Sequence, residues 1–249
     1  SQLERLGREG IDCLVGDSTN ANVPGTSGSE SSLLKPLTDE INRSPHRVVV
    51  TCFASNVARL ITLGKVAKAT GRRLVVLGRG LEKTVGIARS CGYWDEEVSV
   101  VPGRHGAYLP REEVLAVATG SQGEGRAALA RLGADTHHDL DLQEGDKVIF
   151  SARNIPGNED VIARVIANFQ ARNIDVVEHG AVKTHVSGHP HADELRTLYG
   201  WLKPRLVVPT HGEAIHLAAN AEVARTCGVP VTLDARNGDV CQIAGGQLG

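Results

Sequence analysis

The chain has 249 residues, enough for one large domain or two modest ones, and its 27 basic and 29 acidic residues leave a formal net charge of -2. This balance excludes a broad positive surface, so any contact with nucleic acid must come from local clusters, and aromatic residues at 3% argue against a surface built for base stacking. No apolar run approaches the roughly 20 residues of a membrane span, no signal peptide is recognised, and the five scattered cysteines form no disulfide framework, so we expect a cytoplasmic protein.

Short runs rich in Val, Ile and Leu alternate with longer helical patterns. A charged, helix-like start precedes a first strand that ends at Asp17. The later elements are expected, in chain order, as strand 47–54, helix 56–70, strand 72–79, helix 81–91, strand 114–120, a short helix after 125, strand 146–152, helix 158–172, strand 174–178, helix 192–202, strand 205–210 and helix 214–227. Strands that alternate with helices of this length predict an α/β fold with a mainly parallel sheet. A terminal hairpin is expected at the turn formed by Asn237 and Gly238.

Polar and small residues follow the ends of the predicted strands. Asp17 ends the first strand, Ser55 and Asn56 follow the second, and Ser121 and Gln122 follow the strand near residue 117. Because ligands in open α/β sheets gather beyond the carboxyl ends of strands, these residues are typical of a ligand-binding rim. The same residue types also cap helices, so both interpretations stay open for any one loop.

Histidines cluster in the last third of the chain, where six of the ten lie between residues 179 and 216 and three occur in THVSGHPH, 184–191. A metal, a phosphate and plain solvent are the three candidate partners for such a segment. Imidazole is a common zinc ligand, and a carboxylate such as Asp17 can join it. The segment DTHHDLD, 135–141, is expected to be a solvated loop, and His191 is expected to begin a helix at the surface.

Seven segments resemble, in the same order, motifs of the ribonuclease J family, a bacterial member of the β-CASP branch of the metallo-β-lactamase superfamily. They are GDSTNANVPGTSGSE, FASN, LGRGLEK, TGSQGE, IPGNE, HVSGH and PTHGE. The resemblance implies a partial metallo-β-lactamase αββα sandwich made of residues 1–30 and 180–249. Residues 31–179 would form an inserted α/β domain, the β-CASP domain, with a mainly parallel sheet. The partial sandwich would expose apolar surface and unpaired strand edges.

The resemblance also implies roles for individual residues. Asp17 would bridge two zinc ions, His211 would bind one of them, and manganese or magnesium are alternatives to zinc. His189 would act as general acid at the scissile phosphate, with Glu30 orienting it. A histidine at the position of His211 is the pattern of RNA-acting members. The nucleotide and terminal-phosphate pocket would be lined by Ser55, Asn56, Ser121, Gln122, Ser187, Gly188 and His189.

The implied function is that of a zinc-dependent ribonuclease that acts on single-stranded RNA, preferably with a 5′-monophosphate. It would work as a 5′-to-3′ exonuclease and as an endonuclease in rRNA processing and mRNA decay, in a homo-oligomer built through parts absent from this chain. The HxHxDH cluster of the family is not in the sequence, and Asp17 with His211 falls short of the roughly three ligands a zinc ion takes. The chain alone is therefore expected to be inactive. The alternatives are an RNA- or nucleotide-binding fragment without catalysis and another metallohydrolase on the same scaffold.

Overall fold

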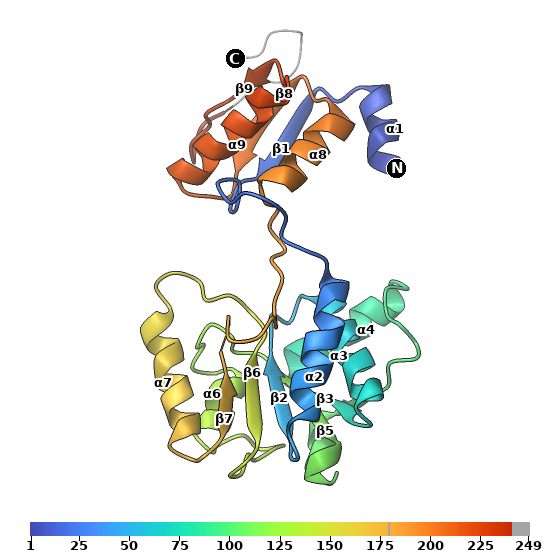
Figure 1. Cartoon of the computed structure of the whole chain (residues 1–249), viewed down its shortest axis with the longest axis vertical. Helices are drawn as coiled ribbons and strands as arrows, with labels where there is room; N and C mark the ends of the chain where they lie inside the picture. The colour runs from blue at the N-terminus through green and yellow to red at the C-terminus, as the bar shows by residue number, and fades with distance from the viewer. Residues whose placement is uncertain (179, 241–249) are drawn as a thin grey trace. The chain divides into compact units, whose positions relative to one another are not determined.

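The computed structural model describes residues 1–178 and 180–240 and divides the chain into two compact units (Figure 1). The larger unit is Ser29–Val186, and the smaller unit combines Ser1–Gly28 with Ser187–Gly249. All strand pairs among these described residues are parallel, which confirms the predicted α/β class with mainly parallel sheets. The boundaries between the two units follow Gly28 and Val186, whereas the predicted domain boundaries follow residues 30 and 179.

Six strands form the sheet of the larger unit, in the order β4-β3-β5-β2-β6-β7. The strands are β2 (Val48–Thr51), β3 (Arg73–Leu77), β4 (Val100–Pro102), β5 (Val114–Ala118), β6 (Lys147–Phe150) and β7 (Asp175–Val177). The helices are η1 (Glu30–Leu33), α2 (Leu34–Asn42), α3 (Val57–Ala69), α4 (Arg79–Ser90), α5 (Gly103–Gly106), η2 (Arg111–Glu113), α6 (Ala128–Gly133) and α7 (Glu159–Gln170). Because β5, β2 and β6 are parallel neighbours, the loops that follow them leave the same edge of the sheet.

Apolar side chains cover both faces of this sheet. Along β2, Val48 and Val50 pack into a core with residues of α2, α3 and α4, while Val49 packs into a second core with residues of α6 and α7. Successive side chains of a strand point to opposite faces, so an unbroken run of valines fits a strand that is buried on both sides. The result is a three-layer unit with helices on each face of the sheet (Figure 1).

The smaller unit has a parallel sheet of order β1-β8-β9 with helices packed on it. Its elements are α1 (Gln2–Glu9), β1 (Cys13–Asp17), α8 (Ala192–Leu202), β8 (Leu206–Thr210), α9 (Ala214–Thr226) and β9 (Val231–Thr232). Leu14 packs with Tyr199 and Val207 in the core, whereas its neighbour Val15 is 61% exposed. Among the strands of the described residues, β1 lies at one edge of this sheet.

The predicted carboxyl-terminal hairpin is only partly covered by the described residues. The segment predicted as its first arm contains β9, which pairs in parallel with β8, and the segment predicted as its second arm falls, apart from Val240, on residues 241–249, which lie outside the described part of the chain. Across the described helices, none combines the length and the apolar character that crossing a membrane requires.

Candidate active site

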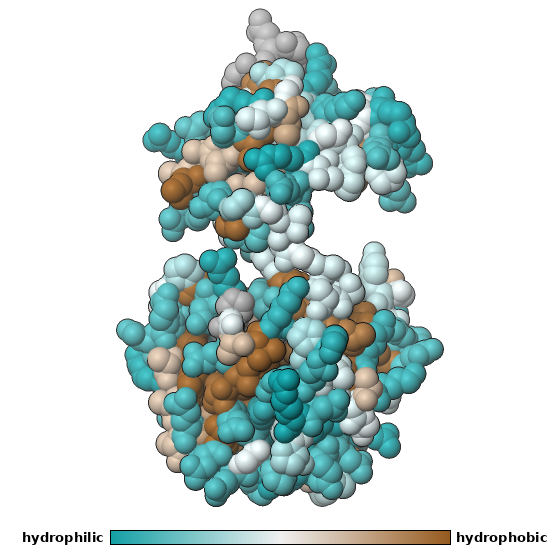
Figure 2. Space-filling view, in the orientation of Figure 1, coloured by the Kyte–Doolittle hydropathy of each residue, from teal (hydrophilic) through white to brown (hydrophobic). Residues whose placement is uncertain are grey.

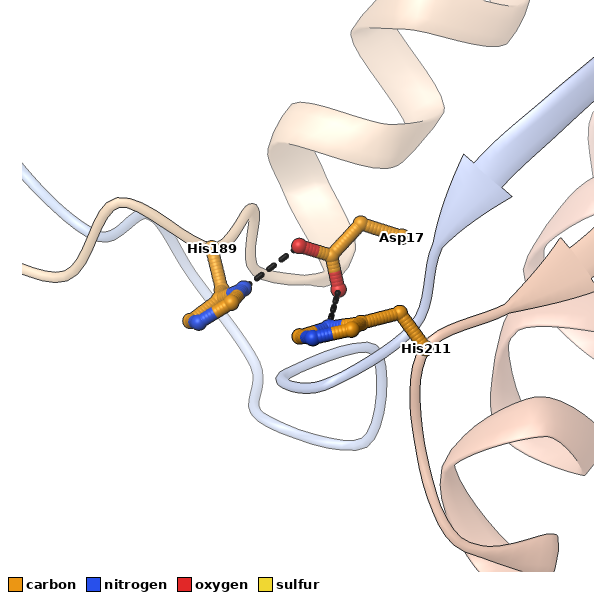
Figure 3. Close-up of side chains that lie close together, drawn as sticks. All are labelled: Asp17, His189 and His211. Atoms are coloured by element: carbon orange, nitrogen blue, oxygen red, sulfur yellow. Dashed lines mark hydrogen bonds and ion pairs between the residues drawn. The ribbon is translucent and has the colours of Figure 1, made fainter. Parts of the chain in front are cut away.

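Asp17, His189 and His211 meet at the carboxyl end of β1, and all three belong to the smaller unit (Figure 3). One carboxylate oxygen of Asp17, Oδ2, lies 2.5 Å from Nδ1 of His189. The other, Oδ1, accepts a hydrogen bond from the backbone N–H of Thr19 at 2.9 Å and lies 3.4 Å from Nδ1 of His211. The two imidazole rings stack with centroids 5.2 Å apart. The three residues that the sequence analysis singled out for metal and acid chemistry are therefore brought together.

The register of the small sheet explains why His211 lies beside Asp17. β1 and β8 are parallel neighbours, and Asp17 pairs with Thr210, the last residue of β8. His211 therefore leaves the sheet at the same edge as the carboxylate. Its backbone has a φ of 55°, the left-handed region that residues other than glycine rarely adopt. The hydroxyl of Thr19 lies within hydrogen-bond distance of both Nδ1 (2.8 Å) and the carbonyl oxygen (2.9 Å) of His211, so it holds both side chain and backbone.

His189 comes from the loop that precedes α8, and neighbouring polar groups fix this loop. The hydroxyl oxygen of Ser187 accepts hydrogen bonds from the backbone N–H of His189 at 3.0 Å and from the side-chain amide of Asn20 at 2.9 Å. Ser187 therefore supports the backbone of His189. Gly188 is exposed between them, and His191 caps the start of α8, as predicted.

The buried side-chain amide of Asn220, on α9, supports the backbone at Asp17. Asn220 is fully buried and donates hydrogen bonds to the backbone carbonyl of Asp17 at 3.1 Å and to the hydroxyl of Ser18 at 2.9 Å. Its own carbonyl accepts a hydrogen bond from the hydroxyl of Tyr199. Burial is the main reason that the pKa of Tyr199 is raised to about 12, so this hydroxyl keeps its proton and remains a donor.

The environment of Asp17 favours its charged form. Burial alone would raise its pKa, but the hydrogen bonds with His189 and Thr19 outweigh burial and lower the pKa to about 2. The carboxylate is therefore ionised at neutral pH and is available to a cation.

The donor atoms of this cluster suit a divalent metal ion. One ligand atom from each of Asp17, His189 and His211 lies within 4.8 Å of the others. A carboxylate with two imidazoles is a set that zinc accepts, and three protein ligands leave one coordination position for water or substrate. His189 was predicted as a general acid and a substrate-binding residue and not as a metal ligand, so the structure adds its Nδ1 to the possible ligand atoms. Three donors suffice for one ion and not for two.

Glu30 lies at the start of η1 in the larger unit, where a buried arginine holds it. Nε of Arg59 donates to Oε1 of Glu30 at 2.6 Å, and Nη2 donates to Oε2 at 3.0 Å. Arg59 is fully buried, and its remaining nitrogen, Nη1, donates to the backbone carbonyls of Ser151 at 2.7 Å and Thr184 at 3.2 Å. Both oxygens of Glu30 are therefore engaged within the larger unit.

The other predicted substrate-binding residues of the larger unit lie in the loops after β2 and β5, which are adjacent strands. Ser55 is exposed. Asn56 caps α3, with its side-chain oxygen accepting from the backbone N–H of Arg59 at 3.0 Å. Ser121 and Gln122 are buried, at 2% and 7% exposed. Their roles in substrate binding stay predictions.

Comparison with known proteins identifies the family. Residues 45–169, about half of the chain, match the family described as ribonuclease J, beta-CASP domain. The chain belongs to the ribonuclease J family. This confirms the resemblance inferred from the sequence motifs. Residues 174–233 match a second ribonuclease J region, described as a Zn-dependent metallo-hydrolase RNA specificity domain.

Several curated members of the ribonuclease J family are similar over nearly the whole chain. Ribonuclease J of Sinorhizobium meliloti is 38% identical over 99% of the chain and 44% of its own length. Ribonuclease J of Mycolicibacterium smegmatis is 40% identical over 92% of the chain and 41% of its own length. Ribonuclease J of Synechocystis is 34% identical over 99% of the chain and 39% of its own length. The chain thus spans about two fifths of the length of these relatives.

Four residues that hydrogen-bond to the predicted site residues of their own unit were not assigned from sequence. Thr19 and Asn20 follow Asp17 directly in the segment GDSTN. Their polar side chains beside the end of the strand were the signal that could have identified them. Arg59 and Asn220 sit within helices α3 and α9, which carry several other polar residues, so the local sequence gives no signal that distinguishes these two.

Proposed function

We propose that this chain is part of a metal-dependent ribonuclease that hydrolyses phosphodiester bonds of single-stranded RNA. The cluster of Asp17, His189 and His211 carries the proposal, because it offers a charged carboxylate and two imidazoles at one sheet edge. The names of the relatives and of the matched RNA specificity domain support RNA as the substrate.

Asp17 and His211 are the proposed metal ligands, with zinc as the ion and manganese or magnesium as alternatives. A bound ion of this kind supplies an activated water and stabilises charge on the phosphodiester oxygens. Asp17 contributes a carboxylate that is ionised at neutral pH, and Thr19 fixes the ring of His211. Asp17 would bridge two ions in the intact protein, where further ligands from outside this chain complete the second site.

His189 is the proposed general acid. The carboxylate of Asp17 engages Nδ1, which leaves Nε2 as the ring nitrogen that can pass a proton to the leaving ribose oxygen. The hydrogen bond from the backbone N–H of His189 to Ser187 holds the backbone that carries the ring, and Asp17 orients the ring itself. Glu30 is proposed to assist His189, and its link to Arg59 gives the carboxylate a fixed position in its own unit.

Ser55, Asn56, Ser121, Gln122, Ser187 and Gly188 are proposed to bind the terminal nucleotide and its 5′-monophosphate. The intact protein would then act as a 5′-to-3′ exonuclease and as an endonuclease in rRNA processing and mRNA decay, in the cytoplasm and as a homo-oligomer. In this proposal the smaller unit supplies the lactamase segments and the larger unit is the β-CASP domain. The family match over residues 45–169 supports the second assignment.

The chain by itself is proposed to bind RNA without cleaving it. The three ligand atoms of Asp17, His189 and His211 suit one ion, and the proposed chemistry uses two. Isothermal titration of the chain with zinc should therefore give a stoichiometry of one at this cluster.

The test is hydrolysis of 5′-monophosphorylated single-stranded RNA by an intact protein of the relatives' length, before and after removal of metal by a chelator. We expect the activity to disappear with the chelator and to return with zinc. His189→Ala should lower the rate by about 10²–10⁴, the usual contribution of a general acid. His105→Ala changes an exposed histidine of the larger unit that lies outside both groups of possible metal ligands, and it is the matched control. Undiminished cleavage after thorough metal removal, or full activity of His189→Ala, would refute the proposal.

A further inference from the structure

The side chain of Gln122 fixes a neighbouring loop of the larger unit. Its amide nitrogen donates to the backbone carbonyl of Arg153 at 3.0 Å, and its oxygen accepts from the backbone N–H of Ile155 at 2.8 Å. The same oxygen lies 3.4 Å from the side-chain nitrogen of Asn158. The loop between β6 and α7 is therefore held in place by a buried residue that follows β5.

This fixed loop forms one wall of a cavity of about 220 Å³. The cavity is lined by Phe150, Arg153, Asn154, Ile162, Ile166 and Glu178. Phe150, Ile162 and Ile166 are buried and give it an apolar floor. Glu178 directly follows β7, the edge strand of the sheet, and Figure 2 shows hydrophobic surface on the larger unit around this strand. The cavity is smaller than the 300–1,000 Å³ of a drug-sized site, so it suits one small planar group.

Three exposed polar side chains line this apolar floor without partners of their own. Across residues 1–178 and 180–240, the side chains of Arg153, Asn154 and Glu178 make no hydrogen bond or ion pair. A few convergent polar groups over an apolar floor, at the carboxyl edge of a parallel sheet, are typical of a small-ligand site.

The signs of the charges indicate the ligand class. A guanidinium alone would suit a phosphate, but the carboxylate of Glu178 would repel one. A neutral group that offers both donors and acceptors suits the pair, and an unstacked base of single-stranded RNA is such a group. Guanine is the base with two adjacent N–H donors on one edge and two adjacent acceptors, O6 and N7, on the other. Arginine is a common bidentate partner of that second edge.

We propose that this cavity binds a guanine base, with Glu178 accepting from its two N–H groups and Arg153 donating to O6 and N7. Asn154 adds an amide at the rim, and Gln122 is a positioning residue that acts through the loop. The inference rests on the proposed function, because it makes the cavity a base-selective subsite for the RNA substrate.

The test is binding of the nucleosides guanosine, adenosine, cytidine and uridine to the intact protein, measured by isothermal titration. Nucleosides carry no phosphate, so the proposed 5′-phosphate pocket does not contribute. We expect guanosine to bind at least about tenfold more tightly than the other three. Glu178→Gln and Arg153→Leu should each remove this preference. Glu96→Gln, which changes an exposed carboxylate of the same unit outside the cavity, should keep it.

Equal binding of the four nucleosides, no binding of guanosine, or a preference that survives in both cavity variants would overturn the inference. RNA hydrolysis by the unmodified protein is measured alongside. If the unmodified protein hydrolyses RNA but shows no preference for guanosine, the guanine site alone is refuted. If the unmodified protein prefers guanosine but does not hydrolyse RNA, the proposed nuclease activity alone is refuted.

Discussion

Replacing Arg59 by leucine should destabilise the larger unit strongly. The arginine is fully buried and donates to both oxygens of Glu30, to the backbone and hydroxyl oxygens of Ser151, and to the backbone oxygen of Thr184. Leucine would remove these donors from the carboxylate of Glu30, which is 24% exposed, and from the carbonyl oxygens of Ser151 and Thr184. Removing one partner of a buried ion pair costs about 3–5 kcal/mol.

Urea denaturation followed by tryptophan fluorescence measures this loss. Trp94 is buried in the larger unit and Trp201 lies in the smaller unit, so a Trp201→Phe background leaves Trp94 as the reporter. With a urea dependence of about 1–3 kcal/mol per M, the midpoint should fall by about 1 M or more. Adding Glu30→Leu to Arg59→Leu should restore part of the stability, because no orphaned carboxylate remains.

The matched control is Lys68→Leu. Lys68 and its partner Glu97 are 70% and 78% exposed, and an exposed pair contributes about 0–1 kcal/mol. If Arg59→Leu shifts the midpoint no more than Lys68→Leu does, the buried network does not hold Glu30, and its fixed position in the larger unit is wrong.

Three further outcomes follow from the smaller unit. Asp17→Asn should weaken zinc binding to the intact protein at least about tenfold by isothermal titration, and unchanged affinity would count against the cluster as a metal site. Asn220→Leu should lower the free energy of unfolding by about 1–3 kcal/mol, because Asp17 and Ser18 lose their buried donor, and denaturation followed by Trp201 fluorescence measures this. The pKa of Tyr199, about 12 against an ordinary 10, favours folding below pH 10, so stability should fall as pH rises from 10 to 12. Tyr199→Phe should flatten that fall in denaturation midpoints, and an unchanged pH dependence would refute it.

The alternation of strands and helices was predictable because each apolar run has the length and period of its element. Helix α8 was predicted at 192–202 and is observed at Ala192–Leu202. Helix α2 and strand β4 were not predicted from the sequence. Helix α2 carries Pro36 in its first turn, where proline is tolerated although it obscures a helical pattern, and β4 has only three residues. Such elements depend on tertiary packing more than on local pattern.

The meeting of Asp17, His189 and His211 was predictable in part, since residues that end parallel strands share an edge. The bonding of Glu30 and Gln122 was not. Glu30 bonds to a residue 29 positions away and Gln122 to one 31 positions away, and nothing in either local segment encodes those partners. The residue types indicated polar side chains at the ends of the strands. Only the folded structure shows which of these side chains already form hydrogen bonds within the protein.

The exposed side chain of Val15 has a practical consequence for handling the chain. Valine is an apolar residue that strands favour, and Val15 is 61% exposed on β1. A charged residue at this position would act as a gatekeeper against association of the chain with itself, so Val15→Lys should keep preparations dispersed at a higher protein concentration.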